Sequence, residues 1–354
     1  MKPRPTFVLI ISAFQLLSFS AFSQGPLTPP AFPAPDPALN NLGQPIPSMK
    51  TLTQVEPRRP ISSAPFTIST PGSYYLTQNL AVANGDAITI STDDVTLDLN
   101  GFTISSTANP AGGTAIFITS GRANITISHG HVKGQVVFSG GNFSGNGFAN
   151  GIHFTGTSPR NVRVMDVSIS GCGSLGINLG VTDSSLVYRS VVRTVGDRGI
   201  TAAVVDSCTA QETGATAIEA ETASNCRGES KGDTGVVAVT ASNCVGRSES
   251  STGVDASQAN NCRGSSNSGT GLTASFATNS SAVSQTGVGL SATTAHNCLG
   301  TSVSGPAGMN IVGTASFCRG SRANGTAINA HIAIGCTVSF GTINAPGGKF
   351  LGTP

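Results

Sequence analysis

The chain has 354 residues, with 19 Lys and Arg against 17 Asp and Glu, and a formal net charge of +2. This balance provides no long-range field for nucleic acid or anionic lipid, so we exclude both as partners. The chain has no Trp and only three Tyr, so the aromatic platforms that often hold sugar rings are scarce.

Residues 1–23 have the pattern of a secretory signal peptide. Lys2 and Arg4 form a positive start, residues 7–17 are apolar, and residues 21–23 offer a small-residue cleavage site. The apolar run is too short to span a bilayer, although a retained anchor is the alternative. We expect a secreted or cell-surface protein with no transmembrane segment after cleavage. Removing the two cations leaves 17 basic and 17 acidic side chains.

Residues 24–62 are expected to form a Pro-rich disordered linker, because they lack a periodic apolar face. Residues 63–354 are expected to form one folded domain. Within it, residues 63–85 are predicted to cap the N-terminal end, and residues 339–354 to form a C-terminal cap and tail.

Inside this domain, large apolar residues recur at wide intervals in the N-terminal half. The intervals between them are 28, 36, 25 and 23 residues, for Ile88, Ile116, Ile152, Ile177 and Ile200. The extra length lies mainly in residues 105–113 and 139–150, which are expected to emerge at one corner of the fold. There they would form a wall beside the face that carries these isoleucines, and such clustered loops commonly build sites.

After Ile200 the chain repeats every 18 residues, and cysteine marks the repeat. Counting backwards and forwards in steps of 18, with one step of 20, predicts that all eight cysteines occupy one column: Cys172, Cys208, Cys226, Cys244, Cys262, Cys298, Cys318 and Cys336, with Ser190 and Ser280 filling gaps. Three residues earlier lies an apolar column that begins at Ile169 and Val187 and continues mostly as Ala. A short fixed period of this kind indicates a solenoid.

The pieces between turns alternate with period 2, which predicts strands. Ala259 and Cys262 are both expected inside, although they are an odd number apart, so Asn261 should break the alternation in a left-handed conformation. Stacked Asn side chains would then bond along the column. The predicted fold is all-β: a single-stranded right-handed parallel β-helix with about 18 residues per coil in the C-terminal half and longer coils in the N-terminal half. A left-handed helix of hexapeptides is disfavoured, because large apolar residues recur once per 18 residues.

The chain resembles the right-handed parallel β-helix proteins of the pectate-lyase-like superfamily. The resemblance rests on the coils and on residues 71–76 and 94–104, which are similar to the opening coils of such secreted proteins. It implies the fold but no single activity, because the superfamily includes lyases, hydrolases, esterases and members without an assigned reaction. The lyases use Asp with Ca²⁺ and an Arg base, and no matching Arg motif occurs here. Asp93 and Asp94 are expected to organise a turn, and Asp98 to face outwards.

Eight cysteines in an exported protein usually indicate disulfides. Residues stacked on parallel strands, however, lie about 4.8 Å apart, whereas the Cβ atoms of a disulfide lie about 3.8 Å apart. We therefore expect mainly free, buried thiols that fill the core. A straight row also fails to converge four ligands on a zinc ion.

Few candidate site residues emerge from the sequence. Each residue that follows an inward isoleucine equivalent should face solvent, and this column supplies the catalytic candidates Glu219, Asp255 and His153. Glu219 and Asp255 are two coils apart, about 9.6 Å, close to the upper limit for an inverting glycosidase. His153 lies three coils from Glu219, about 14 Å, which is too far for proton transfer. The candidate substrate-binding residues are Phe117, Asn178 and Arg163.

One further pair, His129 and His131, resembles a weak metal site with no visible third ligand. No cofactor is expected. The leading hypothesis is therefore an exported scaffold, monomeric and without catalytic residues, that binds glycan or another envelope component. The alternatives are a divergent polysaccharide lyase or glycoside hydrolase, with a groove beside residues 105–113 and 139–150, and a purely structural surface protein.

Overall fold

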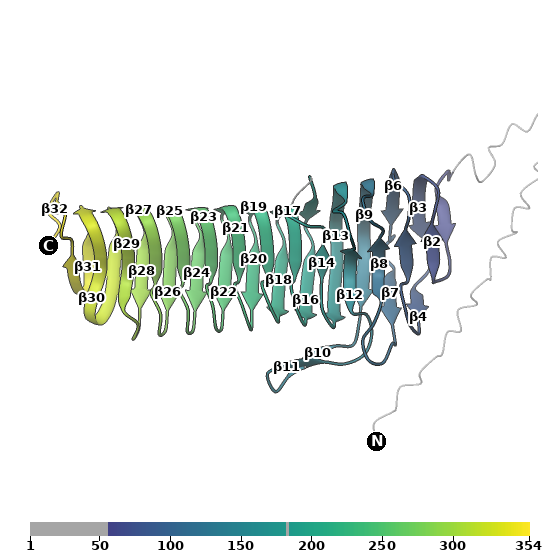
Figure 1. The fold of residues 1–354 in the computed structure, drawn as a ribbon, viewed down its shortest axis with the longest axis horizontal. Helices are drawn as coiled ribbons and strands as arrows, with labels where there is room; N and C mark the ends of the chain where they lie inside the picture. Colours follow the sequence, from purple (N-terminus) through teal and green to yellow (C-terminus); the bar gives the residue numbers. More distant parts are fainter. Residues whose placement is uncertain (1–55, 182–183) are drawn as a thin grey trace, which may run out of the picture. The chain divides into compact units, whose positions relative to one another are not determined.

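The computed structural model describes residues 56–181 and 184–354. The predicted signal peptide, and residues 24–55 of the predicted linker, lie outside the described residues. Thirty strands of the described part join in one parallel sheet that winds into stacked coils (Figure 1). The predicted parallel β-helix is therefore confirmed. No helix in residues 56–181 and 184–354 is long and apolar enough to cross a membrane.

The first coils are built from short strands and long excursions. Their strands are β1 (Arg59–Ile61), β2 (Phe66–Ile68), β3 (Gly72–Leu76), β4 (Leu80–Val82), β5 (Ile88–Ile90), β6 (Val95–Asp98), β7 (Thr103–Ser106), β8 (Thr114–Ile118), β9 (Ala123–Lys133), β10 (Val137–Ser139), β11 (Asn142–Ser144), β12 (Asn150–Phe154), β13 (Arg160–Cys172), β14 (Ile177–Asn178), β15 (Leu186–Tyr188) and β16 (Val191–Val195). β10 and β11 form a separate antiparallel hairpin.

The later coils are regular, and each adds two strands. These strands are β17 (Ile200–Asp206), β18 (Thr209–Thr213), β19 (Ile218–Ser224), β20 (Arg227–Ser230), β21 (Val236–Ser242), β22 (Val245–Ser248), β23 (Val254–Asn260), β24 (Arg263–Ser266), β25 (Leu272–Thr278), β26 (Ser281–Ser284), β27 (Leu290–His296), β28 (Leu299–Ser302), β29 (Ala307–Ser316), β30 (Arg319–Ile334), β31 (Thr337–Asn344) and β32 (Lys349–Phe350). From β17 to β28 the longer strand of each coil supplies a first and a second side and the shorter strand supplies the third side, whereas β30 runs from a third side on into the next coil.

The stack begins earlier than the sequence indicated. β1 lies inside the predicted linker, before the expected boundary at residue 63, and pairs in parallel with β3. Within the predicted N-terminal cap, β2 pairs with β5 and β4 pairs with β7. At the other end β31 pairs with β30. Both predicted caps therefore contain strands that continue the coils.

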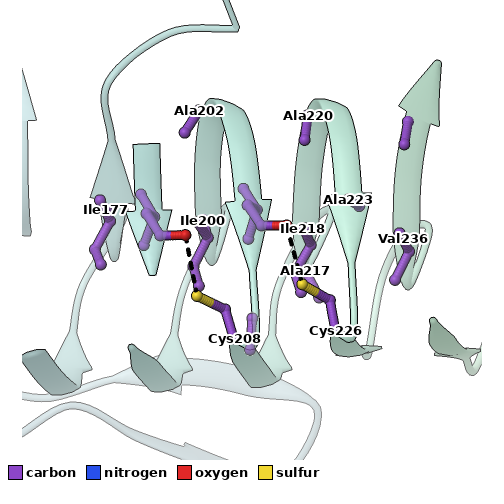
Figure 2. Packing of buried hydrophobic residues seen from close by; sticks show 14 of the residues in the cluster. Ile177, Ile200, Ala202, Cys208, Ala217, Ile218, Ala220, Ala223, Cys226 and Val236 are labelled. Atoms are coloured by element: carbon purple, nitrogen blue, oxygen red, sulfur yellow. Dashed lines mark hydrogen bonds between the residues drawn. The ribbon is translucent and has the colours of Figure 1, made fainter. Parts of the chain in front are cut away.

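The predicted apolar column is confirmed along the first side. Ile88, Ile116, Ile152, Ile177 and Ile200 lie directly over one another, and the column continues through Ile218, Val236, Val254, Leu272, Leu290, Met309 and Ile328. All of these side chains are at most 1% exposed. Figure 2 shows the repeat: Ile200 and Cys208 in one coil, and Ile218 and Cys226 in the next. Each coil thus buries its apolar side chains against its neighbours.

Asparagine turns the chain at the corner before the third side. Asn225, Asn243, Asn261, Asn279 and Asn297 all have φ between 49° and 55°. This confirms the predicted left-handed break in alternation. The amide of Asn243 donates to Oδ1 of Asn225 at 3.2 Å, and that of Asn261 donates to Oδ1 of Asn243 at 2.7 Å. The predicted Asn ladder is therefore present along this corner.

Replacing Asn243 with Ala should destabilise the protein by about 2–3 kcal/mol. Asn tolerates the left-handed conformation, whereas Ala adopts it at a cost of about 1–2 kcal/mol, and the two ladder hydrogen bonds are lost as well. Asn243→Gly keeps the conformation and should cost about 1 kcal/mol. Urea unfolding measures both changes. Equal losses for the two variants would contradict a role of the backbone conformation.

The cysteine column is confirmed for seven cysteines and is wrong for Cys172. The N–H of Val167 points to the hydroxyl of Ser190 at 3.3 Å, and Cys172 pairs with Val195 instead. The coil between Val167 and Ser190 has 23 residues, so a backward step of 18 from Ser190 lands five residues too late. For the same reason Ile169 pairs with Val192, and the residue stacked under Val187 is Val164.

All eight cysteines are buried and free, as predicted. The thiol of Cys244 donates to the carbonyl oxygens of Ser242 at 3.2 Å and Ala223 at 3.4 Å. The hydroxyl of Ser280, in the same column, donates to Thr278 at 2.7 Å and Ala259 at 3.5 Å. In the regular coils the column therefore holds a small side chain that donates a hydrogen bond, and Cys and Ser both do so.

Candidate functional site: a groove beside the β10–β11 hairpin

The two predicted insertions meet at one corner, as expected. The N–H of Gly112 donates to the carbonyl of Gly147 at 2.9 Å, and the N–H of Gly147 donates to the carbonyl of Ala108 at 2.8 Å. The β10–β11 hairpin begins at Val137, two residues before the predicted second insertion, and its Phe138 and Phe143 pair across the strands with ring centres 4.7 Å apart. Figure 1 shows the hairpin running along the edge of the stack towards the C-terminal coils.

The hairpin lies against a row of corner glycines. A Cβ atom placed on Gly196 would lie 3.4 Å from Cβ of Phe143, and one placed on Gly214 would lie 3.3 Å from its ring. These glycines follow directly after third-side strands β16 and β18. The wall therefore stands beside the third side and its corner, and not beside the first side as predicted, because the hairpin follows the glycines that leave room for it.

Two adjoining cavities, which we together call the groove, lie at this corner. The first, of about 450 Å³, lies between Phe138, Phe143 and the glycine row. The second, of about 390 Å³, lies over the outward side chains of β16 to β24. Lys231 and Glu249 line both cavities. Each volume falls in the range of small-ligand sites, and together they extend over several coils.

Charged side chains of both signs line the groove. We call this set the corner cluster: Arg193, Glu212, Glu229, Lys231, Arg247 and Glu249. Lys231 pairs with Glu249 and lies 5.3 Å from the ring centre of Phe138. Glu229 accepts from Gln211 at 3.2 Å, pairs with Arg227, and lies 3.6 Å from Arg247. Because several donors already hold Glu229, it is poorly placed to act as a base.

Glu212 has an unusual backbone. Its φ is +55°, and Thr194 one coil earlier has a φ of +56°. The register between β18 and β20 shifts at this point, which marks a bulge, and bulges commonly redirect side chains near sites. Thr194 donates from Oγ1 to Oε2 of Glu212 at 2.5 Å. The bulge therefore directs a carboxylate towards the groove.

The predicted acids of the first side do not converge. The register places Val237 between Glu219 and Asp255, so two coils separate them as predicted. Glu219 forms an ion pair with Arg198 at 2.9 Å. Partial desolvation raises the pKa of Asp255. Glu219 and Asp255 are two coils apart, and only Glu219 has a cation beside it, so the two carboxylates do not share a position for a reacting atom.

Three of the other predicted residues, Phe117, His153 and Asn178, stack on neighbouring coils of the first side, whereas Arg163 lies apart from them. His153 lies beside Phe117, and its Nδ1 is 3.4 Å from the amide nitrogen of Asn178. Desolvation lowers the pKa of His153. Arg163 lies on the second side, where it pairs with Leu186, so it does not join Phe117 and Asn178. Thr201 is only 4% exposed, and thus the column is not uniformly open to solvent.

His129 and His131 are not arranged as a chelating pair. His129 has a φ of +57° and sits at a corner, whereas His131 lies on the following strand segment opposite Ser168. Nδ1 of His129 is 3.4 Å from Asp98, and its Nε2 is 3.8 Å from Asp166. Its two nitrogens thus face different carboxylates. No group of three or more His, Cys, Asp or Glu suited to one metal ion occurs in the described ranges.

The groove is suited to recognition more than to reaction. It offers amide, hydroxyl, ammonium, guanidinium and carboxylate groups beside two phenyl rings. Sequence reasoning missed the corner cluster because its residues differ from coil to coil. One signal was present in the spacing of the inward residues. Ala210 and Thr213 are separated by an odd number of positions, whereas Gly228 and Ser230 in the next coil follow the regular alternation. This difference marks the bulge at Glu212.

In comparisons with known proteins, no protein-family model matches the chain, and neither a curated protein nor a solved structure matches it.

Proposed function

We propose that the protein is a non-catalytic β-helix scaffold that binds an extended glycan of the cell envelope in the groove beside the β10–β11 hairpin. The observation that carries this proposal is that the two cavities adjoin, with Lys231 and Glu249 lining both. An extended chain can cross several coils there and meet a new set of polar groups in each. The predicted export of the chain agrees with such a ligand, and we also assign the chain to the pectate-lyase-like superfamily on its opening coils and stacked architecture.

Binding should be measured on a panel of envelope and plant polysaccharides, with the wild-type chain and two groove variants. Lys231→Ala removes an ammonium group shared by both cavities, and Phe138→Ala removes the ring beside it. Each should weaken binding at least about tenfold, which corresponds to about 1.4 kcal/mol. Arg263→Ala is the matched control, because Arg263 is an exposed third-side cation that lines neither cavity. Equal weakening by all three variants, or no binding to any polysaccharide, would reject the proposal.

A lyase or hydrolase acting in the same groove is the second candidate. The strained backbone of Glu212 favours it, because such strain concentrates at functional sites. This candidate requires the release of reducing or unsaturated ends, and that release should disappear in Glu212→Gln. Glu219→Gln and Asp255→Asn serve as controls, because neither residue lines the groove. Intact polysaccharide that is bound and recovered unchanged supports the scaffold.

A further inference from the structure

Seven of the eight thiols stack in two uninterrupted runs. The first run is Cys208, Cys226, Cys244 and Cys262, and the second is Cys298, Cys318 and Cys336. In each run the residue after one cysteine donates its N–H to the carbonyl of the cysteine one coil earlier; Arg227, for example, donates to Cys208 at 2.9 Å, and Arg263 donates to Cys244 at 2.8 Å. Ser280 separates the two runs.

Neighbouring thiols within a run are close enough to interact. Parallel pairing of successive coils places each cysteine directly over the previous one in its run. The coil spacing of about 4.8 Å is too wide for relaxed disulfide geometry, and a straight row cannot surround a tetrahedral ion. The coil spacing does fit a metal ion with two ligands in a line, because two metal–thiolate bonds of about 2.3 Å placed end to end span about 4.6 Å.

We propose that adjacent thiols of the column bind a soft, two-coordinate d¹⁰ cation, with mercury(II) as the best charge match, as a linear bis-thiolate between coils. Thiolate is the ligand that soft metals select. In the binding step one Hg²⁺ displaces the protons of two thiols, two S–Hg bonds form, and two protons leave to solvent. The bis-thiolate complex of Hg²⁺ is neutral, whereas the complex of two thiolates with a monovalent ion carries a negative charge. The neutral complex is better suited to a dry core.

The column lies just beneath the surface, with its sulfur atoms buried. Each cysteine of the two runs directly follows a left-handed corner residue. Cys226, for example, is 2% exposed, whereas its neighbours Asn225 and Arg227 are exposed. Only one layer of side chains therefore separates the thiols from solvent.

The test is a count of the mercury ions bound by the folded chain, measured by native mass spectrometry after titration with mercuric chloride. Four thiols make two pairs and three thiols make one, so the wild-type chain should bind three ions. Cys244→Ser leaves one pair in the first run and should bind two. Ser280→Cys joins the runs into eight thiols and should bind four. Ser280 already occupies this column, so both exchanges retain a side chain that the fold accepts.

Cys172→Ser is the matched control, because Cys172 is equally buried but lies outside the column. It should still bind three ions. Three ions in the wild-type chain and the predicted change in each variant would support the proposal. It would be overturned by a lost ion in Cys172→Ser, by one ion per thiol, or by a native wild-type chain that binds none. Glycan binding by the groove is measured separately and does not depend on this outcome.

Discussion

Leu290→Asp should lower the free energy of unfolding by more than about 4 kcal/mol and abolish most soluble expression. Leu290 is fully buried and lies between Leu272 and Met309 on neighbouring coils. A carboxylate there has no partner, and burying an unpaired charge is among the few single changes with so large an effect. Because each coil is stabilised by its two neighbours, the loss of one interrupts the stack. Urea unfolding followed by circular dichroism measures the change.

The adjacent residue provides the control. Ser291 follows Leu290 on the same strand and faces outwards between Thr273 and Asn310. Ser291→Asp adds the same charge to the same coil and should change stability by no more than about 0.5 kcal/mol. Comparable losses for the two variants would contradict the alternation of inward and outward residues along this side.

Ser284→Ala should cost about 3 kcal/mol, although it removes only one oxygen atom. Ser284 is fully buried. Its hydroxyl donates to the carbonyl of Gly269 at 2.6 Å and accepts from the N–H of Gly287 at 2.8 Å. The variant leaves both groups without their partner at a buried corner, and each unsatisfied group costs about 1–3 kcal/mol. Thermal and urea unfolding give the loss.

Ser281→Ala on the same strand is the comparison for this effect. Ser281 is only partly buried, so its replacement should change stability by no more than about 0.5 kcal/mol. A Ser284→Ala variant as stable as Ser281→Ala would mean that the buried serines are not needed to close the corner.

The regular coils were predictable because one residue type per column carries one physical requirement. Asn261 takes the left-handed corner, Val254 fills the interior, and Cys262 donates a hydrogen bond from a small side chain. Each requirement recurs in every coil, so the period itself reveals it. The fold, the apolar column and the free thiols therefore followed from the sequence.

The assignment of Cys172 failed because a period identifies columns only while coil length stays constant. Five extra residues lie between β14 and β15, and they shift every earlier position relative to the backward count from Ser190. Val167, which occupies the cysteine position of that coil, is apolar and cannot be recognised by residue type. Asp166 has a φ of +55° and forms the corner directly before Val167. A search for buried residues on either side of this corner would have assigned Val167 to the column.

The candidate site was predicted only in part. The shared corner of the two insertions followed from their positions between third-side and first-side strands. The direction of the hairpin did not, because it depends on Phe143 packing over Gly196 and Gly214, which lie far away in sequence. The sequence therefore directed attention to Glu219 and Asp255, whereas the groove lies over Lys231 and Glu249.

Pulsed electron paramagnetic resonance on spin-labelled chains tests the stacked register most directly. Cysteines introduced at Ser168, Thr209, Ser281 and Thr337 lie in one outward column, and the native thiols are buried. Thr209 to Ser281 crosses four coils, Thr209 to Thr337 seven, and Ser168 to Thr337 nine. The predicted distances are about 19, 34 and 43 Å, a linear rise with coil number. Distances that do not increase with the number of coils would contradict the stack.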